Sequence, residues 1–209
     1  YSIFNKISVA YPQNQETKFF LNKLKTNKIN SIGNIKFAEN NYERNIKNNH
    51  NLKNLFKDKK IWIASSTHAN EEIFCANAHI QLKKKNSNIV TIIIPRHVHR
   101  VEKIISKIKK MGLNVTIHSS KNKNLKNTDI YIVDTFGETK KFHKIGCSVF
   151  LGGSIIKRGG QNPLEAARYG ARILHGPNVQ NFKDIYKLLE KLKISKKIFS
   201  SKKLASLII

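Results

Sequence analysis

Short apolar runs alternate with amphipathic helical stretches along most of this 209-residue chain. A steady succession of strand, helix and strand predicts a mostly parallel sheet with helices on both faces. The run Ile92-Ile93-Ile94 is continuously apolar, as expected of a strand that is covered on both sides. We therefore expect an α/β fold with a Rossmann-like, doubly wound parallel sheet. The predicted strands are Ile7–Ala10, Ser31–Lys36, Ile61–Ser65, Ile89–Pro95, Asn114–His118, Ile130–Asp134, Ser148–Leu151 and Arg172–His175.

Two helices are predicted from apolar residues that recur at steps of three and four. The first apolar face joins Val98, Val101, Ile104, Ile105, Ile108 and Met111, and the second joins Phe182, Ile185, Leu188, Leu189 and Leu192. The last stretch, 195–209, mixes lysines with a short apolar end. Its composition fits either a fraying terminus or a helix that docks on the rest of the fold.

A change in composition divides the chain. Residues 39–54 are rich in Asn and Lys, with little apolar periodicity, and indicate a linker or a solvated helix. The strand–helix–strand unit that precedes them cannot bury both faces of a sheet by itself. We expect residues 1–36 to be the remnant of an N-terminal domain, 37–58 a linker and 59–209 the main domain. The start at Tyr1 suggests a chain cut out of a longer one.

The charge is strongly basic, with 39 Lys and Arg against 13 Asp and Glu, a net of +26. Such a surface attracts polyanions, including nucleic acid, anionic lipid and phosphorylated substrates. The lysines are dispersed, however, and an AT-rich genome would account for much of the excess. Cys75 and Cys147 have no CxxC spacing, so we expect two small buried residues in a reducing compartment and no metal site.

The most informative segment runs from Gly152-Gly153-Ser154 to Asn162-Pro163-Leu164-Glu165. A buried strand enters a glycine-rich loop, which lets backbone approach a ligand closely, and a helix then begins. Asn162 is a natural N-cap before Pro163, and the helix N-terminus favours an anion. Glu165 lies near the loop, where its carboxylate can accept hydrogen bonds from two ribose hydroxyls. Alternatively, Glu165 merely complements the helix dipole and the glycines merely form a turn.

Three other polar segments follow predicted strands. Arg96 suits a phosphate or a carboxylate, or it caps local carbonyls. In 134–138, Phe136 can pack against a base and Gly137 can present its N–H, or the segment is an ordinary turn capped by Asp134 or Thr135. Hydroxyls and His68 in 65–68 can reach a ligand or simply cap the next helix. Because parallel strands gather such turns along one edge, together they indicate a nucleotide site.

In order and spacing, the segments 65–68, 95–97, 134–138, 152–154 and 159–165 closely resemble the C-terminal domain of the 3-deoxy-D-manno-octulosonic acid (Kdo) transferases, as do 173–177 and 181–182. Residues 31–37 resemble the crossover out of that family's N-terminal domain. The departures are mild: Gln161 stands where the family often has His, Ala69-Asn70 replaces Glu-Gly and Ala166 replaces Pro. They bear on the fine contacts of the donor.

The resemblance implies the C-terminal domain of a B-type glycosyltransferase that moves Kdo from CMP-Kdo to lipid A precursor at the cytoplasmic face of the inner membrane. It implies that the catalytic base lies in the absent N-terminal domain. No cofactor or metal is expected. The residues implied for CMP are Pro95, Arg96, Phe136, Gly137, Glu138, Asn162, Pro163, Leu164 and Glu165. Possible further donor contacts are Ser66, His68, Gly153 and Ser154.

The hypothesis for the complete enzyme is an oxocarbenium-like transition state. Arg96 and the helix N-termini near Gly137 and Asn162 would stabilise the departing phosphate. Three alternatives remain open: a B-type transferase for a UDP-sugar, a basic nucleic-acid-binding module and an inactive gene fragment. Most aromatic residues fall in predicted core positions, so we expect no specific nucleic-acid partner. The basic surface would instead help the protein to sit on anionic lipid.

Overall fold

The computed structural model describes residues 3–32, 49–121 and 123–208. The chain divides into two compact units, Tyr1–Ile46 and Lys47–Ile209. In the first unit, helix α1 (Gln15–Lys23) begins where the side chain of Asn14 accepts a hydrogen bond from the N–H of Thr17. A short 3₁₀ helix, η1 (Phe4–Lys6), precedes it. The strand predicted at Ile7–Ala10 is reduced to one parallel bridge between Ala10 and Ile29, and most of the predicted strand 31–36 lies outside the described residues.

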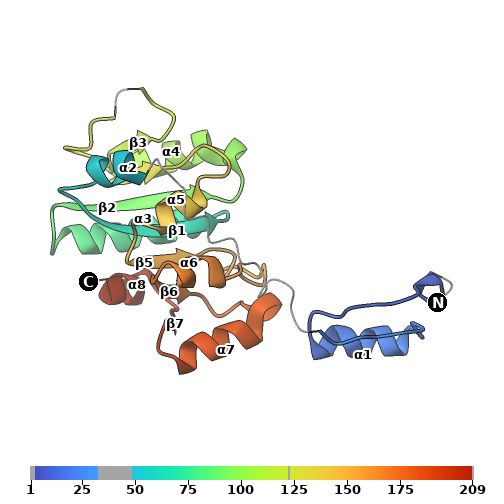
Figure 1. Cartoon of the computed structure of the whole chain (residues 1–209). Helices are drawn as coiled ribbons and strands as arrows, with labels where there is room; N and C mark the ends of the chain where they lie inside the picture. The colour runs from blue at the N-terminus through green and yellow to red at the C-terminus, as the bar shows by residue number, and fades with distance from the viewer. Residues whose placement is uncertain (1–2, 33–48, 122, 209) are drawn as a thin grey trace. The chain divides into compact units, whose positions relative to one another are not determined.

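The second unit is built on a parallel sheet in the order β3-β4-β2-β1-β5-β6-β7 (Figure 1). The strand order reverses between β1 and β5, as in a doubly wound fold. All six strands predicted after residue 59 are confirmed. The bounds are Lys60–Thr67 (β1), Ile89–Pro95 (β2), Val115–Ile117 (β3), Ile130–Ile132 (β4), Ser148–Leu151 (β5), Arg172–His175 (β6) and Ser195–Lys197 (β7).

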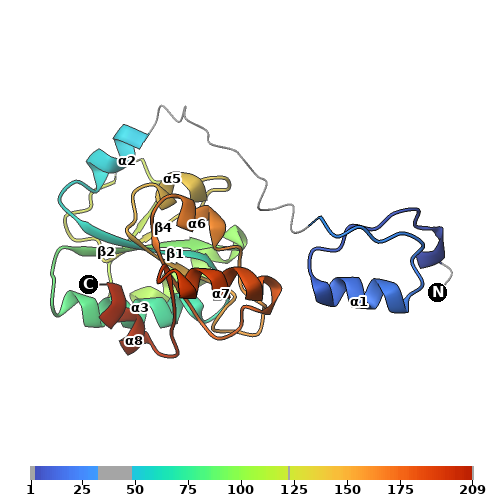
Figure 2. The same ribbon diagram turned by 60° about the horizontal axis from the view of Figure 1, so that its bottom comes forward.

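Helices cover both faces of this sheet (Figure 2). On one face lie α3 (Glu71–Lys83), α4 (Val101–Lys109) and α8 (Ser201–Ile208). On the other lie α2 (Asn49–Leu55), α5 (Thr139–His143), α6 (Leu164–Arg168) and α7 (Lys183–Lys191). Short 3₁₀ helices, η3 (Val98–Arg100) and η4 (Gln180–Phe182), precede α4 and α7.

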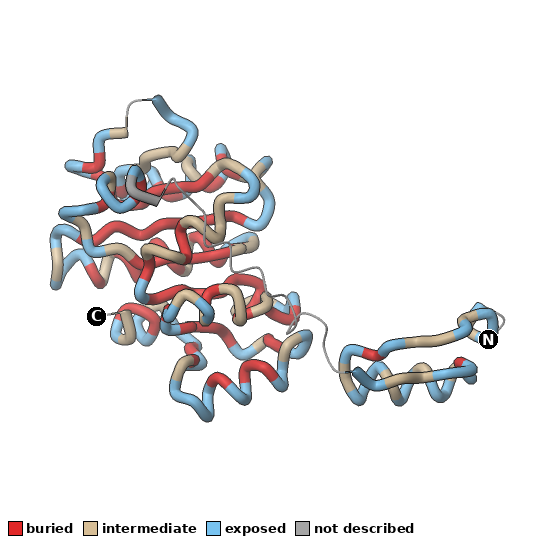
Figure 3. The backbone as a smooth tube through the Cα atoms, in the orientation of Figure 1, coloured by how far each residue is buried: buried red, intermediate tan, exposed pale blue. Residues whose placement is uncertain are grey.

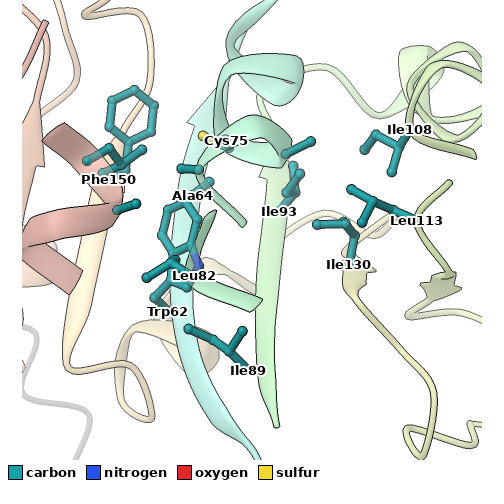
Figure 4. Close-up of a cluster of buried hydrophobic side chains, with 14 of the residues drawn as sticks. Trp62, Ala64, Cys75, Leu82, Ile89, Ile93, Ile108, Leu113, Ile130 and Phe150 are labelled. Atoms are coloured by element: carbon teal, nitrogen blue, oxygen red, sulfur yellow. The ribbon is translucent and has the colours of Figure 1, made fainter. Parts of the chain in front are cut away.

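The sheet is the most buried layer of the unit (Figure 3), and every residue of β2 is buried. Figure 4 shows one face of the core, where Trp62 and Ile93 of the sheet pack with Leu82 of α3 and Ile108 of α4. Burying one such aliphatic side chain contributes about 1.5–3 kcal/mol. A sheet covered on both faces has little room for polar groups, so these gather in the turns.

The N-terminal edge of the strands holds a buried polar cluster. His79 of α3 lies 2.9 Å from the hydroxyl of Thr91 and 3.4 Å from Asp129. The carboxylate of Asp129 also pairs with Lys83 at 2.5 Å and accepts a hydrogen bond from the N–H of Asn114. Burial lowers the pKa of His79 despite the neighbouring carboxylate. These groups tie α3 to the start of β4.

Several expectations need correction. The terminal stretch adds strand β7, which was not predicted. Of the two alternatives for this stretch, the docking helix is confirmed, because α8 packs on α3. The stretch predicted as a linker or a solvated helix contains helix α2, but this helix is not wholly solvated, because Leu52 packs in the core of the second unit. Cys75 is buried but Cys147 is exposed, just before β5. Leu188 and Leu192 are exposed because only part of the predicted face of α7 meets the sheet.

In the ranges that the structure describes, the helices are all too short or too polar to cross a bilayer.

Candidate nucleotide site

The polar turns lie at the carboxyl ends of adjacent strands. Ser65, near the end of β1, is in register with Ile94 of β2 on one side and Leu151 of β5 on the other. Leu151 is in turn in register with His175 of β6. The turns after β1, β2, β5 and β6 therefore leave the sheet side by side (Figure 1), at the edge where open α/β sheets bind ligands.

A buried carboxylate holds the glycine-rich loop in place. Glu71, the first residue of α3, is 0% exposed. One of its oxygens accepts the N–H groups of His68 at 3.0 Å and Gly153 at 2.6 Å. The other accepts those of Ser154 at 3.1 Å and Ile155 at 3.0 Å. The loop's backbone donors thus point at Glu71, which locks the turns after β1 and β5 together.

Gly153 and Ser154 therefore have a different role from the one predicted. The carbonyl of Gly153 accepts the N–H of Gly160. Ser154 is fully buried, and its hydroxyl donates to the carbonyl of Leu151 at 2.5 Å and accepts the N–H of Gly176 at 2.8 Å. Because these groups are already used inside the fold, the loop shapes the site, and we do not retain either residue as a direct donor contact.

The glycine at position 152 is required by a close approach of two backbones. A Cβ at Gly152 would collide with the carbonyl of Ser66 and would lie 2.7 Å from the Cα of Thr67. The N–H of Gly152 donates to the carbonyl of Ser65 at 2.9 Å. Ser66 itself has a positive φ of 54°, an uncommon conformation for a residue with a side chain. The turn after β1 is thus held against the turn after β5.

Glu165 lies on α6 with its side chain 40% exposed, and it faces His143 of α5. Its Oε1 lies 3.5 Å from Nδ1 of His143, whose side chain is 3% exposed. The other ring nitrogen, Nε2, lies 3.0 Å from the hydroxyl of Ser65. The His143 ring holds the pKa of the Glu165 carboxyl below its ordinary value, and Lys140 and Arg168 act in the same direction. At neutral pH, Glu165 is a partly open carboxylate.

Arg96 is exposed directly after β2, and its N–H donates to the carbonyl of Thr67. No described residue forms an ion pair with its guanidinium, which is therefore available to a phosphate. Across the turn from it lies His68, half-buried, with its ring 5.6 Å from that of His97. The Nε2 atom of His68 is buried and finds no hydrogen-bond partner within the described ranges. Burial lowers the pKa of His68, so the ring is neutral at pH 7.

Phe136 is 81% exposed after β4, which is unusual for a large aromatic side chain and leaves its ring open to a base. Gly137 has a φ of 80° with open space around its Cα. The carboxylate of Glu138 pairs with Lys141 at 2.9 Å. Asp134 does not cap α5. It instead accepts the N–H of Ser119 at 2.9 Å, and α5 has no side-chain N-cap.

The remaining predicted residues surround the start of α6. The side chain of Asn162 accepts the N–H of Leu164 at 3.1 Å. However, α6 begins at Leu164 and its N-cap is Pro163, so the predicted N-cap at Asn162 is off by one residue. Pro95 and Pro163 are buried, and Leu164 is half-buried. Both α5 and α6 have only 5 residues. Helices this short have a small macrodipole, so their N-termini offer less charge stabilisation than a longer helix would.

Two functional residues were not predicted. Glu71 follows the segment 65–68, but nothing in the sequence distinguishes it from its neighbour Glu72, which pairs with Arg100 at 3.0 Å. His143 sits in a stretch of lysines without a motif. Only the fold brings it between Ser65 and Glu165.

The fold is that of the C-terminal domain of a B-type glycosyltransferase. It matches a trehalose-6-phosphate synthase, OtsA, with a TM-score of 0.55 and 10% identity, over 95% of this chain and 51% of that one. Within that class, the sequence is similar to the Kdo transferases. The enzyme of Haemophilus influenzae is 32% identical over 163 residues, 78% of this chain and 38% of that protein. The enzyme of Rickettsia bellii is 32% identical over 210 residues, 99% of this chain and 49% of that protein.

A solved structure shares this fold. The C-terminal CMP-Kdo-binding domain of WaaA from Acinetobacter baumannii superposes with a TM-score of 0.72 and 22% identity, over 77% of this chain and 85% of that domain. No protein-family model matches the chain. The chain spans less than half the length of these Kdo transferases. The predicted resemblance to the C-terminal part of that family is confirmed.

Proposed function

We propose that this chain is the donor-binding part of a Kdo transferase, and that it binds the CMP portion of CMP-Kdo. The observation that carries the proposal is that a cationic and an anionic side chain lie at the same edge of the sheet. The guanidinium of Arg96, which has no ion-pair partner among the described residues, follows β2. A partly open carboxylate, Glu165, lies on α6 after β5. A nucleotide needs both, a cation for its phosphate and an acceptor for its ribose hydroxyls.

Within this site, different residues bind the phosphate, the ribose and the base. Arg96 binds the phosphate and stabilises its charge as the sugar leaves. Glu165 accepts hydrogen bonds from the ribose. Phe136, highly exposed beside the open backbone of Gly137, packs against the base. Asn162 and Leu164 hold the first turn of α6, and so the backbone that carries Glu165.

The transfer step is proposed to use groups from outside this chain. In the whole enzyme, a base from the N-terminal part deprotonates the hydroxyl of the acceptor, a lipid A precursor. Residues 1–36 are proposed to be the end of that acceptor domain. The Kdo transferases named above support the choice of reaction, and we expect this chain alone to bind CMP without transferring sugar.

Isothermal titration of the 209-residue chain with CMP tests the proposal. We expect Arg96→Ala and Glu165→Ala each to weaken binding about tenfold or more, the loss of a hydrogen bond to a charged group. Matched controls are Arg172→Ala, at the start of β6, and Glu102→Ala, exposed on α4. No CMP binding, or equal effects of test and control variants, would refute the site.

The same titration separates the alternative ligands. UMP or UDP binding more tightly than CMP would indicate a UDP-sugar enzyme, since the fold alone serves many donors. DNA displacing CMP in a salt-dependent manner would indicate a nucleic-acid-binding module.

We also propose that the basic chain, with a net charge of +26, rests on the anionic cytoplasmic face of the inner membrane. Co-sedimentation with vesicles of anionic phospholipid, lost at high salt, is the expected result. Equal binding to neutral vesicles would contradict an electrostatic attachment.

A further inference from the structure

A row of three side chains connects the centre of the sheet to the carboxylate proposed to bind ribose. Ser65 belongs to β1, His143 ends α5 and Glu165 lies on α6. The contacts are 3.0 Å from Ser65 Oγ to His143 Nε2 and 3.5 Å from His143 Nδ1 to Glu165 Oε1. Ser65 and His143 are buried, whereas Glu165 is partly open. The row therefore leads from the interior to the edge of the site.

The direction of hydrogen-bond donation along these three side chains follows from the available donors. A neutral histidine carries one ring N–H. If Ser65 donates its hydroxyl to Nε2, the proton of the ring lies on Nδ1 and points at Glu165. The opposite tautomer would turn the lone pair of Nδ1 toward a carboxylate and repel it. The arrangement that avoids repulsion runs as donor to acceptor from Ser65 through His143 to Glu165.

The Oε1 atom of Glu165 is buried, although the side chain as a whole is 40% exposed. Its exposure therefore comes from the other atoms of the side chain. Within the described parts of the chain, Oε1 and His143 Nδ1 have no partner at ideal hydrogen-bond distance. The gap of 3.5 Å between them is short enough to close on binding, as contacts in unliganded sites often do.

We propose that His143 is a positioning residue, which donates from Nδ1 to Glu165 Oε1 and so orients the carboxylate for the ribose diol. This inference rests on the proposed nucleotide-binding function. With Oε1 held by His143, the remaining lone pairs of the carboxylate are set toward the ligand. A carboxylate without this support would rotate freely and lose rotamer entropy on binding.

The test measures the affinity of CMP and of 2′,3′-dideoxy-CMP, which lacks both hydroxyls. We expect His143→Phe, which keeps a ring but removes both nitrogens, to weaken CMP about tenfold, the worth of a hydrogen bond to a charged group. The affinity for the dideoxy nucleotide should change less than about twofold, because Glu165 has no hydroxyl to bind there. A residue that only stabilises the fold would weaken both nucleotides equally.

Two smaller variants distinguish the contributions of the two ring nitrogens to CMP binding. His143→Asn can place an amide near Nδ1 and should restore part of the affinity for CMP. His143→Gln can place an amide near Nε2, toward Ser65, and should not. Both variants also decide the matter if His143→Phe fails to fold. The matched control is His79→Phe, another buried histidine, which lies in the cluster with Asp129 at the opposite edge of the sheet.

Three results overturn the inference. They are unchanged CMP affinity in His143→Phe, equal losses for CMP and the dideoxy nucleotide, or rescue by Gln rather than Asn. These differ from a failure of the proposed function, in which the unmodified chain would not bind CMP or Glu165→Ala would have no effect. That second kind of result would refute both proposals.

Discussion

Replacing Glu71 by Gln tests whether one buried carboxylate assembles the site. Each oxygen of Glu71 accepts two backbone N–H groups, from His68 and Gly153 on one side and from Ser154 and Ile155 on the other. The amide of Gln turns an NH₂ group toward one of these pairs, whichever way it faces. Two backbone donors, one in a buried and one in a part-buried hydrogen bond, then lose their acceptor.

An unsatisfied buried donor costs about 1–3 kcal/mol, so Glu71→Gln should lower the free energy of unfolding by about 2–6 kcal/mol. Relief from burying a charge offsets part of this cost, which favours the lower half of the range. Equilibrium unfolding in urea measures the change, and CMP titration should show weakened binding because the turns after β1 and β5 separate.

The matched control is Glu72→Gln, the neighbouring buried carboxylate. Among the described residues, its two oxygens form hydrogen bonds with one partner, the guanidinium of Arg100, at 3.0 and 3.1 Å. The Glu72→Gln substitution should leave CMP binding unchanged. A destabilisation of less than about 1 kcal/mol in Glu71→Gln, with normal CMP affinity, would refute the reasoning that this carboxylate organises the loop.

Two further predictions concern the turns and the pH dependence of stability. Gly152→Ala should cost more than the 1–3 kcal/mol or so typical of overpacking, because its Cβ would meet the backbone of Ser66 and Thr67. Gly137→Ala should lower the free energy of unfolding by only about 1–2 kcal/mol, because a Cβ there has open space and only the φ of 80° is unfavourable. If urea unfolding showed the larger loss for Gly137→Ala, the packing argument for Gly152 would be refuted. Burial lowers the pKa of His79 and of His175 in the folded state, so the unfolded chain binds protons first as the pH falls below about 6.5. Stability should therefore decrease from pH 7.5 to 5.5, by up to about 1.4 kcal/mol per pH unit for each histidine, and His79→Gln should reduce the slope. Stability that rises toward pH 5.5 would contradict this sign.

The architecture follows from the sequence because its signals are local. A continuously apolar run such as Ile92-Ile93-Ile94 is buried on both sides only in a sheet that is covered on both faces. Strand β2 has the predicted bounds. Strand β7 escaped prediction because Ser195–Lys197 has two exposed lysines and no apolar alternation. Its place in the sheet is set by pairing with β6 and not by its own composition. Leu188 was predicted on the apolar face of α7 but is exposed. Periodicity shows which face of a helix is apolar but not how much of that face packs against the sheet.

The succession of strands along the chain could be predicted from the sequence, but the contacts that support the candidate site could not. The order of the strands in the sheet brings Arg96, in the turn after β2, and Glu165, on α6 after β5, to one edge of the sheet. The sequence could not show that Glu71 already occupies the N–H groups of Gly153 and Ser154, because residues 82 or more positions apart make those contacts. The same holds for His143, 78 positions from Ser65. Long-range polar contacts of this kind leave no local pattern.

A crystal structure of the chain with CMP bound would test the central claim most directly. We predict that the Arg96 guanidinium contacts the phosphate and that a Glu165 oxygen accepts from the ribose hydroxyls, with both residues on one nucleotide. A nucleotide bound elsewhere, or one that reaches Arg96 while Glu165 stays beyond hydrogen-bond distance, would contradict it.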